Sequence, residues 1–563
     1  MQSRRIQPVE GGEPEDARSV DRTVRPSPPR RALAIVALII SIVGLGGVLR
    51  APSAAQHLQQ PGTPLGDAAG SIAPPGAPPA LCSACRPGGA PWVSPGHSPL
   101  IDRTGEAAHV DPGQVAAADS EAPPDRRFGA VEAFEAPFAA SYAGVGWERI
   151  NFDWPALQPG GPHSWNRAAI SGVTIAHEIA AGREVVGIIG GRPAWAVDAR
   201  GLPRGLYLPP TDPRNMWGAF VAELARRYRG RVRHWIIWNE PDVWDAHASG
   251  YTWPGTVDDF ARLQKVAYTQ IKSVDPFLVV HLAATTYWWD KAYNRPLYFG
   301  RLLDALARDP TARAHHWYFD VASAHVYNVP DDVERIIRID RDLMHAHGFG
   351  KPLWLVETNA MPTRDGPWTM ASARWSATAA EQAAYVVQAS ALALAAGAER
   401  VSFYKMTDPA GLSTRAYPMG LVRPDGTARP VVAALRATTH ALADWTRAVD
   451  LGTTAGVRAV AIERGASGAS GGTLVLWATG TSSADVTVDI PVPPGATAAW
   501  LDAHVAIVAD DDTGLPVVAT IAGDRAILRL TLPASACAQT GLCQIGGAPL
   551  MVVAPAMPRI AAW

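Results

Sequence analysis

From Phe128 onward, short apolar runs alternate with longer stretches whose apolar residues recur every three or four positions. The short runs are typical of buried strands, and the longer stretches of amphipathic helices. There are eight short runs: FGAVEAF (128–134), GWERINF (146–152), EVVGIIG (184–190), HWIIW (234–238), LVVHLA (278–283), FDVASAHVY (319–327), LWLVE (353–357) and VSFYKM (401–406). We predict an α/β fold, a (β/α)8 TIM barrel over residues 128–440, since such barrels need about 250 residues. A doubly wound open sheet shows the same alternation and is the alternative.

The helices on either side of the fourth run can be delimited from their capping residues. Asp212, which is followed by a proline, predicts the N-cap of one helix, and Gly230 ends it. Thr256 and Asp259 have the spacing of a capping box, so we expect the next helix to begin there. Residues 232–238 then form the fourth strand. Side chains that follow a barrel strand lie at its C-terminal end, where the chemistry of this fold takes place.

After about residue 445 the helical period disappears, and apolar residues alternate with polar ones. The alternation is clearest over residues 486–490 and 526–532, and Gly-rich stretches separate such runs. A period of two predicts strands with one buried face. We therefore predict a small all-β sandwich domain over residues 445–563.

Residues 32–49 form an uncharged apolar run about long enough to cross a bilayer. Seven arginines precede the run and only Arg50 follows closely, so the positive-inside rule places residues 1–31 in the cytoplasm. Residues 50–127 are rich in Pro, Ala and Gly, which is typical of a disordered linker. We expect a transmembrane anchor that leaves the rest of the chain outside the cytoplasm. A secreted form, cleaved after the small residues 51–55, is the alternative.

The four cysteines form two local pairs, Cys82 with Cys85 and Cys537 with Cys543. Outside the cytoplasm, such pairing predicts disulfides. The CSAC sequence of the first pair also suits a redox or zinc site, but no second CxxC or histidine cluster completes one. The formal net charge is −2 and there is no basic stripe, so we do not expect a nucleic-acid partner.

Two glutamates stand at the ends of apolar runs that belong to different barrel strands. Glu240 follows the fourth run in the sequence WNEP (238–241), and Glu357 ends the seventh run. Two carboxylates at the C-terminal ends of barrel strands are what glycosidic cleavage requires, one as the acid and the other as nucleophile or base. Fifteen of the twenty tryptophans lie between residues 147 and 375, and their flat apolar faces suit sugar rings.

With WNEP after the fourth strand and a lone glutamate at the seventh, the chain resembles the retaining glycoside hydrolases of clan A. Within that clan it is most similar to family 39 and to family 5-like enzymes, which include membrane-associated bacterial endoglycosidases. The resemblance covers roughly residues 128–440 and the trailing sandwich. Supporting stretches are GVGWERINFDWPALQP (144–159), RPAWA (192–196), AHVY (324–327) and GLVRPDGTARPVVAAL (420–435).

The resemblance implies roles for single residues. Glu240 corresponds to the acid/base, and Glu357 to the nucleophile. Asn239 corresponds to the residue that holds the sugar 2-hydroxyl, with a turn-capping amide as the alternative role. Arg149, expected at the end of the second strand, corresponds to an arginine that orients the nucleophile and keeps it ionised. A salt bridge with a purely structural role is the alternative for Arg149.

Five further residues are candidates for substrate binding. His325 and Tyr327 on the sixth strand correspond to residues that line the same site, and Tyr327 could hydrogen-bond the nucleophile; a packing role alone is the alternative. Trp195 lies in the RPAWA stretch. Related enzymes commonly end the eighth strand in a tryptophan that supports the sugar, whereas this chain has VSFYKMTD (401–408). Tyr404 could stack on the sugar instead, and Lys405 could bind an anionic or polar substituent.

These residues together predict a retaining O-glycoside hydrolase that acts on a polysaccharide or oligosaccharide. No cofactor and no metal are expected, because the candidate site consists of carboxylates, an amide and an arginine without a cluster of metal ligands. A transglycosylase would use the same residues with a sugar acceptor in place of water. A non-catalytic carbohydrate-binding barrel protein is the alternative from a different class, since fold alone does not prove activity.

The arginine asymmetry around residues 32–49 leads to a test of topology. Protease added to intact cells or spheroplasts should degrade the barrel and spare the N-terminal tail, because only the tail lies in the cytoplasm. Immunoblots against the two parts measure this. Protection of the barrel would contradict both the topology and the disulfide prediction, and a soluble form that begins near residue 55 would indicate a cleaved signal.

Overall fold

A computed structural model of the protein describes residues 124–554, apart from residues 249, 371–374, 411, 413–416, 466–470, 492–505, 510–517, 523–524 and 542. The predicted cytoplasmic tail, the anchor at 32–49, almost all of the linker and the Cys82–Cys85 pair lie outside the described residues. Over the described ranges, no helix combines the length and the apolar character that a bilayer crossing requires.

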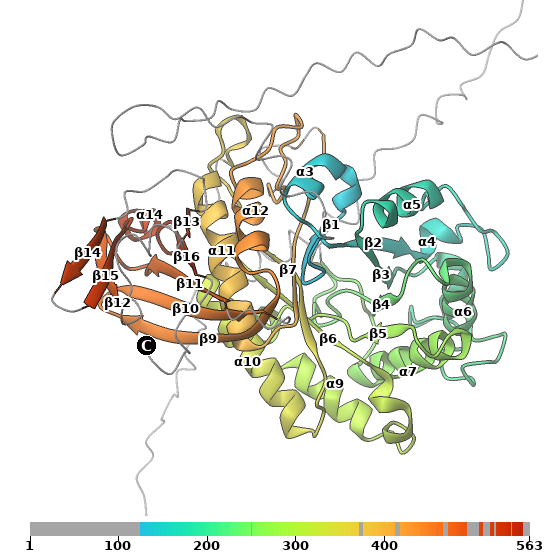
Figure 1. Cartoon of the computed structure of the whole chain (residues 1–563). Helices are drawn as coiled ribbons and strands as arrows, with labels where there is room; N and C mark the ends of the chain where they lie inside the picture. The colour runs from blue at the N-terminus through green and yellow to red at the C-terminus, as the bar shows by residue number, and fades with distance from the viewer. Residues whose placement is uncertain are drawn as a thin grey trace, which may run out of the picture.

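Eight parallel strands form one sheet in the order β5-β4-β3-β2-β1-β8-β7-β6. They are β1 (Phe128–Val131), β2 (Trp147–Asp153), β3 (Glu184–Gly190), β4 (His234–Ile237), β5 (Val279–His281), β6 (Ala322–Tyr327), β7 (Leu353–Asn359) and β8 (Arg400–Phe403). A parallel bridge between His281 and Val321 joins the two outer strands, so the sheet closes (Figure 1). The TIM barrel is confirmed, and each predicted run overlaps one strand. Closure rules out the open doubly wound sheet.

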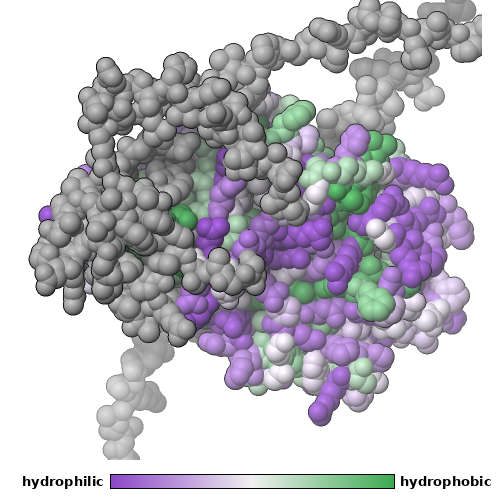
Figure 2. Space-filling view, viewed as in Figure 1, coloured by the Kyte–Doolittle hydropathy of each residue, from purple (hydrophilic) through white to green (hydrophobic). Residues whose placement is uncertain are grey.

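Helices surround the strands and bury their apolar faces against them, as Phe220 and Leu224 of α6 do. The helices are α3 (Pro137–Tyr142), α4 (Trp154–Leu157), α5 (Gly172–Ala180), α6 (Met216–Tyr228), α7 (Val257–Val274), α8 (Trp288–Ala292), α9 (Tyr298–Ala307), α10 (Pro330–Ala346), α11 (Ala379–Ala396) and α12 (Val431–Ala441). Short 3-10 turns are η1 (Ala133–Glu135), η2 (Ala194–Ala196), η3 (Arg313–Tyr318) and η4 (Gly366–Trp368). On the barrel face seen in Figure 2, most of the coloured residues are hydrophilic.

The two predicted helix starts have different outcomes. The capping box of α7 is confirmed, because Thr256 Oγ1 accepts from Asp259 N at 3.1 Å and Asp259 Oδ2 accepts from Thr256 N at 2.9 Å. The predicted N-cap of α6 is wrong, since Asn215 caps this helix by accepting from a backbone N–H at 3.0 Å. Asp212 instead accepts from the backbone N–H and the guanidinium of Arg214, so it stabilises a turn that precedes the helix.

Aromatic and charged side chains fill the N-terminal end of the barrel. The rings of Trp147 and Trp354 have centroids 5.5 Å apart, and the Arg400 guanidinium lies 4.0 Å from the Trp354 centroid. Arg400 Nη1 donates to Glu184 Oε2 at 2.6 Å, which balances the arginine charge. A Cβ at Gly129 would lie 2.4 Å from the Trp147 ring, so a glycine is needed there. This packing leaves the C-terminal end of the barrel for chemistry.

The chain after the barrel forms two antiparallel sheets, in the orders β13-β16-β11-β10-β9 and β12-β15-β14. The strands are β9 (Trp445–Thr454), β10 (Val457–Arg464), β11 (Gly471–Ala478), β12 (Val486–Pro491), β13 (Ala506–Ala509), β14 (Val518–Ala522), β15 (Arg525–Leu532) and β16 (Leu550–Ala554). Val460 and Val475 belong to the core shared with the barrel, whereas Ala461, Leu474 and Leu530 belong to a separate core between the sheets. The two sheets and the core between them agree with the predicted sandwich. The short helix α14 (Ala536–Thr540) was not predicted, because five residues show no helical period.

Helix α11 lies between the barrel and the β domain (Figure 1). Almost all of its side chains are buried, because it contacts β7 and β8 of the barrel as well as β9, β10 and β11. Such a helix is apolar all round and lacks a clear solvent face. Gln388 of α11 donates to Gly547 O at 2.9 Å and accepts from Gly546 N at 3.0 Å, which fixes the β domain to this helix.

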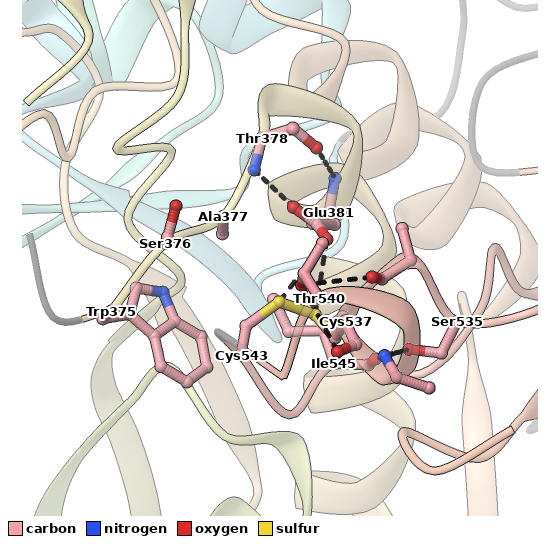
Figure 3. The surroundings of a disulfide bond; sticks show 12 residues. Trp375, Ser376, Ala377, Thr378, Glu381, Ser535, Cys537, Thr540, Cys543 and Ile545 are labelled. Carbon is pink, nitrogen blue, oxygen red and sulfur yellow. Dashed lines mark hydrogen bonds between the residues drawn. A yellow bond between two sulfur atoms is a disulfide. The ribbon is translucent and has the colours of Figure 1, made fainter. Parts of the chain in front are cut away.

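The predicted Cys537–Cys543 disulfide is confirmed. Figure 3 shows it against the N-terminal turn of α11, where Oε1 of Glu381 lies 3.4 Å from each sulfur. Ser535 caps α14 and donates to Ile545 O at 2.6 Å, so the segment that carries the disulfide is also held by hydrogen bonds. The bridge therefore stabilises a contact between the β domain and the barrel.

We expect the paired change Cys537→Ala and Cys543→Ala to lower the free energy of unfolding by about 2 kcal/mol, because the bridge closes only a short loop. Urea titration followed by tryptophan fluorescence measures the change. Wild-type protein in reductant should unfold at the same urea concentration as the double variant. Equal stability of the oxidised wild type and the double variant would contradict the expectation.

Candidate active site

Glu240 lies just past the end of β4, where the backbone turns sharply. Trp238 has φ 72° and Glu240 has φ 42°, left-handed values that residues other than glycine seldom adopt. The turn is held because Trp238 N donates to Ile189 O at 2.7 Å and Glu240 N donates to Ala284 O at 3.1 Å. The backbones of β3 and of the segment after β5 therefore hold this turn, and the Glu240 side chain is fully buried.

Glu357 lies inside β7, two residues before the strand ends, and not at its last position as expected. His325 is its register partner on β6, and an irregularity in the pairing falls directly before His325. Such an irregularity can re-aim a side chain, which is common beside active sites. Adjacent positions on two parallel strands thus present His325 and Glu357 to the same region.

His325 contacts both glutamates. Its Nδ1 lies 2.7 Å from Glu240 Oε1 and 3.5 Å from Glu357 Oε2. One carboxylate oxygen of Glu240 and one of Glu357 lie within 4.8 Å of each other. The two carboxyl groups predicted from separate strands therefore form a close pair.

Two further side chains bind Glu357. An Arg149 Nη2 forms an ion pair with Glu357 Oε1, and the Tyr327 hydroxyl donates to Glu357 Oε2. Arg149 lies in the first half of β2 and not at its end, so the expected position was wrong. Its long side chain reaches the glutamate from there. Arg149 and Tyr327 are both buried, so water does not screen these contacts.

The surroundings give the two glutamates opposite charge states. Burial, then the charge of Glu357, then that of Asp242 raise the pKa of Glu240 well above its ordinary value. Burial also opposes ionisation of Glu357, but the charge of the Arg149 guanidinium and the hydrogen bond from the Tyr327 hydroxyl hold the pKa of Glu357 below its ordinary value. The surroundings thus favour the protonated form of Glu240 and the ionised form of Glu357.

Burial lowers the pKa of His325 to about 4, so its ring is neutral at neutral pH. A neutral imidazole can accept a hydrogen bond at one nitrogen and donate at the other. Burial and the charge of Glu357 raise the pKa of Tyr327 well above its ordinary value, so its hydroxyl stays protonated and donates. Neither residue adds a charge to the site.

Asn239 and Tyr404 border this group. Asn239 is half-buried, and its Oδ1 has no hydrogen-bond partner among the described residues. Tyr404 follows the last residue of β8 and meets the Tyr327 ring edge-on, with centroids 6.4 Å apart. Burial and the charge of Glu357 raise the pKa of Tyr404, so its hydroxyl stays protonated.

Lys405 and Trp195 contact residues outside the pair of glutamates. Lys405 Nζ lies 2.5 Å from Glu132 Oε2 and 3.3 Å from Glu135 Oε2, so two carboxylates already balance its charge. Trp195 Nε1 donates to Gln158 O at 2.8 Å. Over the described residues, neither side chain has a contact with Glu240 or Glu357 like those of Arg149, His325 and Tyr327.

Asp242 is a buried residue near the pair that the sequence did not indicate. Its Oδ2 accepts from Thr286 N at 2.8 Å and from Thr286 Oγ1 at 2.6 Å, which joins the loops after β4 and β5. Burial raises the pKa of Asp242 to about 7. In the sequence it is one more acidic residue after WNEP, and the only signal was its closeness to Glu240.

The described residues contain two groups with metal-ligand spacing. Glu240, His325 and Glu357 form one, and Glu381, Cys537 and Cys543 form the other. The first group faces the Arg149 guanidinium, whose charge opposes a second cation. The sulfurs of the second group are bonded to each other and offer no thiolate. Neither group is well suited to a metal ion.

The opposite pKa shifts predict opposite effects on stability. For Glu240, with its raised pKa, folding is penalised as pH rises above the ordinary value of 4.5. Glu240→Gln should therefore raise the free energy of unfolding by about 1 kcal/mol at pH of about 8, with a smaller gain near pH 4.5.

For Glu357, with its lowered pKa, the stabilisation is present above pH 4.5 and is lost as pH falls through the folded-state pKa. Glu357→Gln should cost about 3 kcal/mol at neutral pH, because Arg149 loses its buried partner.

Urea titrations of the wild type and the two variants across this pH range measure these effects. Each variant is the control for the other, since both replace a buried glutamate by its amide. Effects of the same sign at neutral pH would contradict the assigned charge states.

No protein-family model matches the chain. In structure the chain is similar to a family 39 glycoside hydrolase from the gut symbiont Bacteroides cellulosilyticus WH2. The TM-score is 0.55 at 15% identity, over 77% of this chain and 81% of that one. A family 30 xylanase C from Talaromyces cellulolyticus gives a TM-score of 0.49 at 15% identity, over 76% of this chain and 96% of that one.

In sequence, 89 residues are 37% identical to a β-xylosidase from Caldicellulosiruptor saccharolyticus. This match spans 15% of the chain and only 17% of that protein's length. It is a local similarity. The structural similarity, at its low identity, concerns the fold. The carboxylate pair therefore lies in a barrel whose fold is similar to that of a family 39 glycoside hydrolase.

Proposed function

We propose that the protein is a retaining O-glycoside hydrolase that cleaves a polysaccharide or oligosaccharide by double displacement. The observation that carries the proposal is the buried pair of Glu240 and Glu357, with one oxygen of each within 4.8 Å of the other. Retaining enzymes hold their two carboxyl groups about 5–5.5 Å apart, whereas inverting enzymes need about 6.5–9.5 Å to admit a water. The similarity in fold to a family 39 glycoside hydrolase supports the same activity.

In the first step, Glu357 attacks the anomeric carbon while the bond to the leaving oxygen breaks. Glu240 gives its proton to that oxygen, and an ester joins the sugar to Glu357. The protonated state of Glu240 and the ionised state of Glu357 fit these roles. Asn239 has an amide oxygen without a partner among the described residues, and it could accept a hydrogen bond from the sugar 2-hydroxyl.

In the second step, water attacks the ester and Glu240 acts as the base. Once Glu357 is esterified it no longer carries a charge, so the second-largest cause of the raised Glu240 pKa is removed. The pKa of Glu240 then falls, and its carboxylate can accept a proton from water. One residue thus serves as acid and base because its neighbour changes charge.

Arg149 and Tyr327 position the nucleophile. Both bind Glu357, one at each oxygen, and fix the plane of the carboxylate. Release of one oxygen is needed when the ester forms, and a neutral hydroxyl is released more easily than a guanidinium. We therefore assign attack on the sugar to Oε2, the oxygen that Tyr327 binds.

We also propose that the enzyme acts outside the cytoplasm and is tethered through residues 32–49. The Cys537–Cys543 disulfide supports this location, because such bonds persist in oxidising compartments. Secretion after signal cleavage is compatible with the same disulfide. The substrate is then a glycan outside the cytoplasmic membrane.

Stereochemistry tests the two glutamates together. NMR of early product from a 2,4-dinitrophenyl glycoside, with the β-xyloside tried first, should show the starting anomeric configuration, because two inversions give retention. Glu357→Ala should abolish turnover, and added azide should restore product of inverted configuration. A wild-type product of inverted configuration would exclude Glu357 as nucleophile.

Glu240→Ala separates the acid role from the base role. Turnover of substrates with poor leaving groups should fall about 10²–10⁴-fold, because these need protonation. Substrates with very good leaving groups should still glycosylate Glu357, and the covalent intermediate should accumulate in mass spectra. Azide should release product of retained configuration. Near-normal activity of both alanine variants would favour a different site, and transfer to added sugar in place of water would indicate a transglycosylase.

A further inference from the structure

A cleft of about 530 Å³ lies beside the acid/base, between the segment after β4 and the segment after β5. Its volume is within the range of about 300–1,000 Å³ that is typical of ligand sites. Pro241, which directly follows Glu240, forms part of its wall, together with Trp244, Trp253 and Tyr298. The cleft therefore begins one residue along the chain from the group that protonates the leaving oxygen.

The position of the cleft assigns it to one side of the cleaved bond. Its described lining comes only from the chain between β4 and β6. The groups that bind Glu357 come instead from β2 and β6, on other parts of the barrel wall. The sugar that becomes esterified lies at Glu357, so a chain that continues past Glu240 enters the cleft on the leaving-group side.

Trp244 gives the cleft an aromatic surface. This residue is 40% exposed, although large apolar side chains are usually buried. Trp289 and Tyr293 meet its ring edge-on, with centroids 5.7 and 4.9 Å away, and the Arg295 guanidinium lies 4.9 Å from the ring centroid. These contacts hold the indole in one orientation, with the guanidinium over part of the ring, and still leave the residue 40% exposed. A fixed and exposed aromatic ring suits the apolar face of a sugar.

Tyr298 provides an independent indication of a ligand. It lines the cleft and is only 6% exposed, yet its hydroxyl has no hydrogen-bond partner among the described residues. Buried hydroxyls are normally hydrogen-bonded, so this group is suited to a ligand hydroxyl. Arg295 and Arg301 also line the cleft, and both are oriented by the fully buried Asp290, at 3.5 and 3.1 Å. Each guanidinium has N–H donors beyond those that one shared carboxylate can accept.

The charges of the cleft favour a neutral ligand. Its three arginines, Arg295, Arg301 and Arg308, are matched by Asp258 and Asp304 in the lining and by Asp290 behind it. Such a balanced set recognises hydroxyl groups through hydrogen bonds. It offers no excess positive charge to an acidic sugar.

We propose that this cleft binds a neutral sugar residue on the leaving-group side of the cleaved bond, so that the substrate is a glycan chain and not a small glycoside. This inference rests on the proposed function, because the side of the bond is defined by the role of Glu240. Trp244 supports the sugar face, and Tyr298 and the arginines bind its hydroxyls.

Isothermal titration calorimetry of full-length protein carrying Glu357→Gln tests the proposal. The probes are xylohexaose, cellohexaose and mannohexaose as neutral chains, and the galacturonate hexamer as an acidic one. At least one neutral chain should bind. Adding Trp244→Ala should weaken its binding at least about tenfold, and adding Tyr298→Phe about fivefold, through loss of one hydrogen bond. Trp244→Phe, which keeps an aromatic ring, should weaken it less than Trp244→Ala.

The matched control is Phe277→Ala, which removes another aromatic side chain, 80% exposed, before β5 at the opposite end of the barrel. It should leave the dissociation constant unchanged. Equal effects of Phe277→Ala and Trp244→Ala, binding of the acidic hexamer alone, or no binding of any neutral chain would each overturn the cleft assignment. Hydrolysis of the neutral hexamers and of the dinitrophenyl glycosides by the wild type is measured separately. If it occurs while the cleft variants have no effect, only the cleft assignment fails; if it is absent, the proposed function fails.

Discussion

The site in this barrel depends on which of two buried carboxyl groups is ionised. Glu240 and Glu357 are both removed from water, and His325 Nδ1 contacts each of them. Burial alone would protonate both. Arg149 breaks the symmetry because it binds only Glu357, so the charge stays there and the proton stays on Glu240. The difference in charge between the two glutamates therefore follows mainly from the placement of one guanidinium.

The rest of the fold serves this placement. Arg149 extends from β2, Glu357 and His325 lie on the paired strands β7 and β6, and Glu240 is turned inward by two left-handed residues after β4. Because these strands are fixed by a closed ring of hydrogen bonds, side chains from distant parts of the sequence meet without a flexible loop. At the N-terminal end of the barrel, the packed side chains of Trp147, Trp354 and Arg400 hold the same strands together.

What could be predicted from the sequence follows from local patterns. The apolar runs predicted all eight strands, and Glu240 and Glu357 were found because each stands at or near the end of a run. The position of Arg149 within β2 was predicted wrongly. The sequence pattern alone does not show at which residue a strand ends, and β2 continues to Asp153. Asp242 and the pairing of Lys405 with Glu132 were missed for another reason. Both depend on loops after different strands that meet only in the folded barrel.

Helix α11 has a consequence for how the chain can be divided. Its side chains are buried almost all round, because the barrel covers one face and the β domain covers the other. Cutting the chain after the barrel would leave a wide apolar stripe in water, together with the unpaired amide of Gln388. Exposed apolar surface of this kind drives aggregation. We therefore expect the barrel to stay soluble only together with the β domain, although the two differ in architecture.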